Sequence, residues 1–424
     1  MARFAKTAAV SVAVLGLVGG LAACSGSSGG DAGSGTVTLD WSFWDQGTTN
    51  DSWKALADDV HKSDANLTVK MTMTPFADYF TKLQSQLAAG TTACIVSMQS
   101  LRLPAFKDAL EPIGPLMEKA GFDASEWNEG ALKALQVDGQ QYAIPYGLST
   151  MLLYYNKDMF KAAGVTEPTN DWTTADFEDA AKKVTAATGK PAFGQSFSDL
   201  HMFSMLLAYN GARPVTDEAK LDLTNAEMKQ AFTWYTGLST NQKVASVPAS
   251  SSDVPWGEQQ FVAGNVAMAV DGDWNISSNA SDAKFNVGVV ALPQGENGGG
   301  TYSANSGFGI SKSCEHKEEA AKAIAVITGA DAQVAQAEAG THPARTAADD
   351  AFFKSLATTV DKKTPGYSEQ AKAAMEAASA KSIPFISTAS WDNTTKLIAR
   401  EFILAYSGDE SADSALQSVQ QSAK

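Results

Sequence analysis

Residues 266–278 read VAMAVDGDWNISS, and this stretch joins a buried strand to the start of a helix. The apolar run of small and β-branched residues stops at Asp271 and Gly272, which is typical of a buried strand. Asp273 and Trp274 follow at once, so a helix start and a flat indole are expected at the carboxyl end of the strand. Open α/β sheets bind ligands at that edge. Taken alone, however, the pattern fits a core tryptophan better, because most Trp side chains are largely buried.

The length and composition indicate a globular chain with two domains. Its 424 residues exceed what one ordinary hydrophobic core holds, and 44% of them are hydrophobic. The formal net charge is −15, and removal of residues 1–23, which carry Arg3 and Lys6 but no acid, makes it more negative still. Such a surface repels polyanions, so nucleic acid and an anionic membrane surface are poor partners.

The N-terminus has the pattern of an export signal. Residues 1–23 contain a short basic region and a segment rich in Ala, Val and Leu, too short and Gly-interrupted for a spanning helix. The segment ends in Leu-Ala-Ala before Cys24, which resembles the lipobox of bacterial lipoproteins. The resemblance implies cleavage before Cys24, a diacylglyceryl thioether on its sulfur with palmitate as an attached acyl chain, and anchoring at the extracellular face of the cell membrane. Residues 24–36 then form a flexible Gly/Ser linker. The alternative is an ordinary secreted protein with a stray cysteine.

The exported part retains two cysteines, Cys94 and Cys314. In an oxidising compartment two cysteines favour a disulfide over free thiols or a metal site. The four histidines are scattered, at His61, His201, His316 and His342. Because no cluster has the spacing of zinc ligands, we expect neither a metal nor another cofactor.

The mature chain opens with alternating strands and helices. Strands are predicted at residues 36–44, 66–73 and 94–98, with helices at 53–63 and 79–89 between them. This β-α-β-α-β order opens a three-layer α/β domain.

Two later stretches indicate where the chain changes domain. A pause at residues 147–150 separates two strands and is interpreted as a crossing into a second, helix-rich unit, and the chain is expected to return near residues 301–311. Within the second unit, Thr224 and Glu227 predict a capping box.

The order of these signals resembles the extracellular solute-binding proteins of ABC importers, in the carbohydrate-binding group that includes the maltose-binding protein. The resemblance is carried by YAIPYGLSTMLLYYNKDMFKAAGV at 142–165, DWTTADFEDAAKKV at 171–184, FVAGNVAMAVDGDW at 261–274, VGVVALP at 287–293, SGFGISKSCEHKEEAAKAI at 306–324 and AYSGDESADSALQ at 405–417. It covers nearly all of the mature chain, and the order of the motifs is more specific than any one of them.

This resemblance implies an α/β, type II periplasmic-binding-protein-like fold with two hinge-linked, three-layer lobes. The N-terminal lobe would hold residues 37–147 and 302–346, and the C-terminal lobe residues 148–301 and 347–424. A sugar or oligosaccharide would be held in the cleft between the lobes, which close by hinge motion and present it to the membrane permease. The protein would be a monomer and not an enzyme.

The resemblance also implies a disulfide between Cys94 and Cys314. In the family fold the strand through residues 306–311 runs antiparallel beside the strand at 94–98, which brings the two cysteines within bridging distance. Both would lie in one lobe, so the bridge should leave the hinge free.

A sugar offers apolar C–H faces and a rim of hydroxyls, so its site needs aromatic planes together with carboxylate, amide or guanidinium groups. The residues predicted to contact it are Trp44, Asp45, Gln46, Tyr79, Gln99, Arg102, Ser149, Asp199, His201, Trp256, Asp273, Trp274, Tyr302, Asn305, Arg345 and Trp391. Trp274 with Asp273 matches the aromatic that stacks on sugar in relatives. The chain departs from the family at Cys94, where an Asp is commoner.

Several of these residues also fit plain structural roles. Trp44 could equally be a core residue, Arg102 fits a surface ion pair, and Ser149 fits an ordinary turn. Asp199 also suits a helix cap, and a lone histidine such as His201 is more often structural.

Two other functions fit part of the pattern. A secreted carbohydrate-active enzyme needs two carboxylates about 5–10 Å apart, which Asp45, Asp199 and Asp273 could supply. However, the chain contains no nucleophile elbow, HExxH motif or phosphate loop. A binding protein for a peptide or polyamine is the other alternative.

Overall fold

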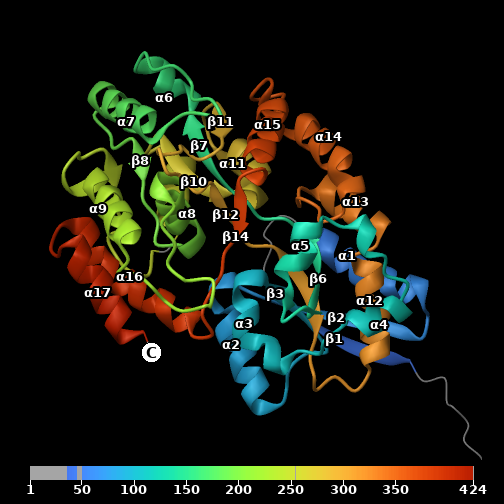
Figure 1. Cartoon of the computed structure of the whole chain (residues 1–424). Coiled ribbons are helices and arrows are strands. Elements are labelled where there is room, and N and C mark those ends of the chain that lie inside the picture. Colours follow the sequence, from blue (N-terminus) through green and yellow to red (C-terminus); the bar gives the residue numbers. More distant parts are fainter. Residues whose placement is uncertain (1–35, 45–49, 254, 424) are drawn as a thin grey trace, which may run out of the picture. The chain divides into compact units, whose positions relative to one another are not determined.

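The computed structural model describes residues 36–44, 50–253 and 255–423 (Figure 1). The predicted export signal, the lipobox cysteine Cys24 and nearly all of the linker lie outside the described residues, as do Asp45 and Gln46. Within the described ranges, no helix combines the length and apolar character that crossing a membrane requires.

The first lobe is built on a five-stranded sheet in the order β2-β1-β3-β13-β6. Its strands are β1 (Val37–Trp44), β2 (Leu67–Thr74), β3 (Ile95–Gln99), β6 (Ala143–Gly147) and β13 (Ser306–Ile310). β1 is parallel to both β2 and β3, whereas β13 is antiparallel to β3 and β6. The chain therefore leaves this sheet after β6 and returns to it much later through β13.

The second lobe has its own five-stranded sheet, in the order β11-β7-β10-β8-β9. The strands are β7 (Met151–Asn156), β8 (Phe193–Gly194), β9 (Ala245–Ser246), β10 (Met268–Gly272) and β11 (Val287–Val290). β7 is antiparallel to both β10 and β11. The two sheets confirm the prediction of two α/β lobes.

Alternation along β7 shows how the second sheet separates two helical layers. Leu153 and Tyr155 belong to one apolar core, whereas Leu152 and Tyr154 belong to another, because successive side chains of a strand point to opposite faces. The first core includes residues of α7 (Thr174–Thr188), α8 (Asp199–Asn210), α9 (Ala226–Thr240), α16 (Trp391–Ser407) and α17 (Ala412–Ser422). The second includes residues of α10 (Trp256–Val262), α11 (Ile276–Asp282), α14 (Asp349–Val360) and α15 (Tyr367–Ser379).

An aromatic cluster fills the core of the first lobe. Trp41 from β1 meets Trp53 from α1 (Asn50–Ser63) and Phe308 from β13 edge-on, with ring centroids 6.4 and 4.9 Å apart. Figure 1 shows the same joining of distant segments, with α12 (Lys317–Ile327) near α1. The other helices that follow strands of this lobe are α2 (Phe76–Ala89), α3 (Leu103–Phe106), α4 (Gly114–Lys119), α5 (Glu129–Ala134) and α13 (Ala330–Ala339). Residues separated by more than 200 positions thus share one core.

The segments that cross between the lobes are hydrogen-bonded to each other. The backbone N–H of Ala304 donates to the carbonyl of Ser149 at 3.0 Å, and the N–H of Ser149 donates to Asn305 Oδ1 at 3.3 Å. A third segment joins them, because the N–H of Leu148 donates to the carbonyl of His342 at 3.1 Å. The predicted crossings near residues 147–150 and 301–311 therefore lie side by side.

Three helix starts differ from the predictions. The helices expected at residues 53–63 and 79–89 each begin three residues earlier, at Asn50 and Phe76. The predicted capping box of Thr224 and Glu227 is wrong, because Asn225 is the N-cap of α9 and its side chain accepts from the N–H of Met228. Asn caps a helix as well as Thr does, so either residue fits the pattern.

Cys94 and Cys314 form a disulfide, with their Cα atoms 4.7 Å apart. Cys94 immediately precedes β3, and Cys314 follows β13, its antiparallel neighbour, in which Ile310 is paired with Ile95. Both cysteines pack with the core of the first lobe. The bridge therefore lies within one lobe, as predicted.

Candidate ligand-binding site

Trp274 presents an exposed aromatic face where β10 ends. It lies in the single turn that connects β10 to α11 and is 37% exposed, unusual for so large an apolar residue. Its six-membered ring lies directly against Gly272, where an added Cβ would come within 2.0 Å of the ring. Glycine at this position therefore lets the indole lie over the end of the strand with one face open to solvent.

A buried polar cluster lies close to this indole. The His201 ring from α8 is 6.1 Å from the Trp274 ring, at a steep angle of 73°. His201 Nε2 is 2.8 Å from Glu258 Oε1, on α10, and 3.3 Å from Asp271 Oδ1, on β10. Burial by itself lowers the pKa of the imidazole, but the two carboxylates outweigh it and raise the pKa to about 10.

Asp273 is fully buried and braces the crossing segments. Its Oδ1 accepts from the N–H of Thr150 at 3.1 Å, and its Oδ2 lies 2.9 Å from His342 Nδ1. Its own N–H donates to the carbonyl of Thr150 at 3.0 Å. Both carboxylate oxygens are therefore engaged within the protein, and the predicted sugar contact of Asp273 stays a prediction.

Arg102 brings together predicted residues from both lobes. Its guanidinium forms ion pairs with Asp392 and, at 3.6 Å, with Asp199, and its side chain is only 11% exposed. Trp391 Nε1 donates to the same Asp199 at 2.8 Å. Because Arg102 follows β3 of the first lobe and its partners belong to helices of the second, this group links the lobes.

Four predicted aromatic residues are buried in the structure. Trp391 and Tyr302 both pack against Phe385, with ring centroids 5.1 and 4.7 Å away. Trp44 packs edge-on against Tyr79, at 5.2 Å, inside the first lobe. Each of the four is 5% exposed or less, so none offers an open face for stacking.

The hydroxyl of Tyr79, which was predicted to contact the sugar, is hydrogen-bonded inside the first lobe. Its hydroxyl donates toward the carbonyls of Ser42 and Ser97 and accepts from the N–H of Ser97, all at 3.0–3.1 Å. Burial raises the pKa of this phenol above its ordinary range. Tyr79 therefore ties α2 to β1 and β3, and its polar group is not available to a ligand.

The remaining predicted residues lie at crossings or at the periphery of the described site. Gln99 is the last residue of β3 and is paired with Ser306, next to the hydrogen-bonded Ser149 and Asn305. Trp256 begins α10, is partly exposed, and donates from Nε1 to Ser246 Oγ at 3.2 Å.

Arg345 is engaged within the first lobe. It forms an ion pair with Glu126 at 2.5 Å, its Nε donates to the carbonyl of Thr328 at 2.9 Å, and its guanidinium lies 3.7 Å from the centre of the Trp127 ring. Its Nε and Nη1 are thus engaged by protein contacts. The predicted ligand contact of Arg345 stays a prediction.

Three residues near the site were not predicted. Phe76 begins α2 directly after β2, is 43% exposed, and meets Trp44 edge-on at 5.6 Å. Its position after a strand end was a usable signal, because the carboxyl end of β2 lies beside that of β1. Glu258 and Asp392 carry no such signal, since their partners lie 57 and 290 positions away.

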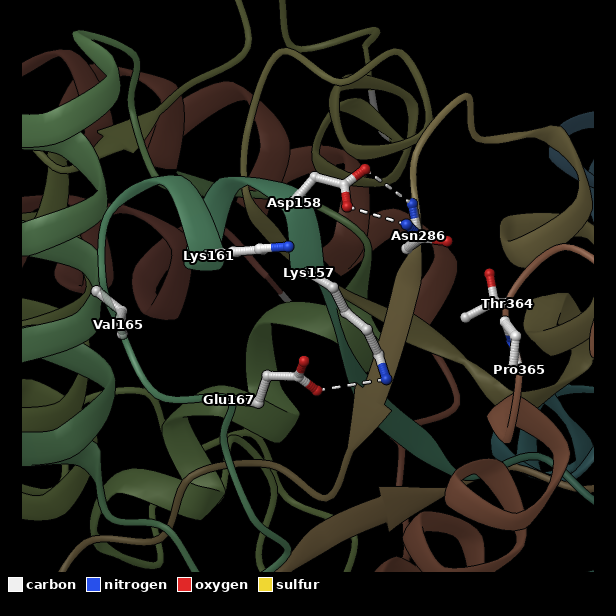
Figure 2. Close-up of a pocket in the computed structure, with 8 residues that line it drawn as sticks. All are labelled: Lys157, Asp158, Lys161, Val165, Glu167, Asn286, Thr364 and Pro365. Atoms are coloured by element: carbon white, nitrogen blue, oxygen red, sulfur yellow. Dashed lines mark hydrogen bonds and ion pairs between the residues drawn. The ribbon is translucent and has the colours of Figure 1, made fainter.

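Two surface cavities among the described residues lie elsewhere on the second lobe. Figure 2 shows one of about 460 Å³ beside α6 (Lys157–Ala162), where Lys157 pairs with Glu167 at 3.3 Å and Asp158 accepts from Asn286. Its lining contains none of the predicted ligand residues. The candidate site is therefore identified by its side-chain chemistry.

Comparison with protein families shows the class of protein to which this chain belongs. Residues 46–334 match the family described as bacterial extracellular solute-binding protein. The match covers more than half of the chain, and the chain belongs to this family. It is accordingly a binding protein that acts outside the cytoplasm rather than a secreted glycosidase.

Individual relatives agree with this assignment. The chain is 26% identical over 217 residues to the maltodextrin-binding protein of Bacillus subtilis, a match that spans 49% of this chain and 51% of the relative. A Listeria monocytogenes ABC substrate-binding protein, solved in complex with cycloalternan, is 25% identical with a TM-score of 0.78, covering 91% of this chain and 97% of that one.

A third solved structure has a similar fold. The acarbose-binding receptor of Streptomyces glaucescens is 22% identical, with a TM-score of 0.74, and the match covers 91% of this chain and 96% of that one. Together these structures confirm the predicted two-lobe, type II α/β fold.

Proposed function

We propose that this chain is the solute-binding component of an ABC importer and that it binds a sugar or oligosaccharide between its two lobes. The observation that supports this most is the exposed indole of Trp274 at the carboxyl end of β10. An indole face held in this way suits the apolar C–H face of a pyranose ring. The relatives solved with cycloalternan and acarbose point to the same ligand class.

The polar groups that link the two lobes suit the hydroxyl rim of a sugar. Asp199 and Asp392 of the second lobe and Arg102 of the first pair with one another, and each retains donor or acceptor positions that hydroxyls can fill. A ligand that contacts both sides of this group favours the conformation in which the lobes meet. Ligand binding would therefore shift an equilibrium between open and closed lobes.

The proposal also includes where the protein lies in the cell. Residues 1–23 direct export, Cys24 carries the lipid that anchors the protein to the outer face of the membrane, and residues 24–36 act as a tether. The lobes comprise residues 37–147 with 302–346, and 148–301 with 347–424. The chain acts as a monomer that delivers its ligand to the transmembrane permease.

Titration calorimetry on residues 37–424 tests this proposal. The panel contains linear and cyclic α-glucans, other oligosaccharides, monosaccharides, peptides and polyamines. We expect saturable binding of at least one saccharide, and chromatography of the released ligand should recover it unchanged. Binding restricted to peptides or polyamines would overturn the sugar assignment, and turnover of a saccharide would overturn the assignment as a binding protein.

A further inference from the structure

We propose that His201, Glu258 and Asp271 form a binding site for one divalent transition-metal ion beneath Trp274. The three side chains come from α8, α10 and β10, and one ligand atom from each lies within 4.8 Å of the others. They provide one imidazole nitrogen and two carboxylate oxygens, the donor set that zinc-class ions take in proteins. The inference goes beyond sugar binding and does not depend on it.

Charge balance favours a divalent cation at the centre of this cluster. Two carboxylates face a single imidazole nitrogen, and a proton on that nitrogen can be donated fully to only one of them. The described ion pairs of Glu258 and Asp271 involve no Lys or Arg. With a protonated imidazole the buried cluster keeps one net negative charge, whereas a divalent ion in place of the Nε2 proton makes it neutral. Burying an unbalanced charge is costly, so the ion removes a penalty.

One unsatisfied polar atom in the cluster, Glu258 Oε2, provides an independent observation. Glu258 Oε2 and His201 Nδ1 are both buried and have no hydrogen-bond partner among the described residues. The His201 side chain is only 7% exposed, so solvent does not readily replace the missing partners. An ion bound by both Glu258 oxygens would satisfy Oε2, which a proton on Nε2 cannot do.

Asp271 is held in place as a metal ligand usually is. Its Oδ1 accepts from the N–H of Gly272 at 2.8 Å, and its Oδ2 accepts from Asn279 Nδ2 at 2.7 Å. Asn275 Nδ2 donates to Asp271 Oδ2 at 3.1 Å as well. These neutral donors fix the orientation of the carboxylate without neutralising it, as the outer-shell partners of metal ligands do.

The two distances from His201 Nε2 to the carboxylates are close to the ligand spacing around a tetrahedral ion. Ligands about 2.0–2.2 Å from a tetrahedral ion lie about 3.4 Å from one another. The separation of His201 Nε2 from Asp271 Oδ1 is already 3.3 Å, and that from Glu258 Oε1, at 2.8 Å, has to widen by about 0.6 Å. Glu258 is the most exposed of the three side chains, at 12%, so it can move and also marks the entry path.

The test uses residues 37–424 free of any histidine tag and of sugar, stripped with EDTA and dialysed. Zn²⁺ is titrated calorimetrically, bound zinc is counted by elemental analysis after dialysis, and Co²⁺ is added separately to look for the strong visible absorption of a four-coordinate site. We expect one ion per chain. Glu258→Gln keeps the shape of the side chain and its hydrogen bond but removes the charge, and it should weaken Zn²⁺ binding on the order of 100-fold or more.

Two control variants show whether a loss of Zn²⁺ binding is specific to the cluster. His61→Gln changes a histidine of the first lobe whose Nδ1 lies 3.0 Å from the carbonyl of Leu67, and Glu111→Gln changes a carboxylate paired with Lys317. Both controls should bind Zn²⁺ like the unmodified chain. Absence of stoichiometric zinc in the unmodified chain, or equal affinity in Glu258→Gln, would overturn the proposal in favour of a metal-free imidazolium pair. Saccharide binding is measured separately, so neither result bears on the proposed transport function.

Discussion

Replacing Trp274 by alanine removes the one open aromatic face at the end of β10, and the structure sets the size of the expected loss. A Trp residue buries up to about 250 Å², so the 37% that is exposed corresponds to roughly 90 Å² that a stacked sugar can cover. At about 25 cal/mol per Å² this area contributes about 2.3 kcal/mol. The dissociation constant for the best saccharide should therefore rise about 50-fold.

The same substitution also affects folding, so affinity must be measured on folded protein. The buried remainder of Trp274, roughly 160 Å², sets an upper limit of about 4 kcal/mol on the loss in free energy of unfolding. Calorimetry is carried out well below the melting transition, and circular dichroism confirms that the variant is folded.

Gly272→Ala provides a second, independent perturbation of the same surface. Gly272 has φ of −80°, which alanine adopts without strain, but its new Cβ would come within 2.0 Å of the Trp274 ring. The indole must therefore rotate away while its chemistry is unchanged, and affinity should fall by a similar factor. Unchanged saccharide affinity in both folded variants would refute the role of Trp274 as a platform.

Three further predictions follow from the contacts between and within the lobes. Arg102→Ala removes an ion-pair group of low exposure that links the lobes, at a cost of about 2 kcal/mol, between the values for exposed and buried pairs. Small-angle X-ray scattering of the sugar-free variant should show a larger radius of gyration, and an unchanged radius would contradict the link. Replacing Cys94 and Cys314 by serine opens a loop of 220 residues and should lower the free energy of unfolding in urea by about 5 kcal/mol. Saccharide affinity should stay the same, and a change in it would mean that the bridge does restrain the hinge. Phe76→Ala removes the exposed ring at the start of α2, and a loss of affinity of up to about 30-fold would assign it to the site, whereas no loss would leave it as surface packing.

The sequence by itself determined the order of the main strands and helices and their division between two lobes. Hydrophobic alternation and helix stop signals are local, so strands such as β1 and β7 and the helix stop at Gly189 could be located from residues close in the chain. The family pattern extended this local information to the type II fold. Helix starts were less certain, because neighbouring residues such as Thr224 and Asn225 are equally able to cap a helix.

The tertiary structure alone decided which predicted residues are free to bind. Trp274 and Trp391 both stand at or just before a helix start, yet one is exposed and the other is buried against Phe385. The polar clusters were beyond local reasoning for the same reason, since Arg102 and His201 meet carboxylates far away in the chain. Burial and charge pairing depend on which distant segments are brought together, and that is a property of the folded chain rather than of any one stretch of it.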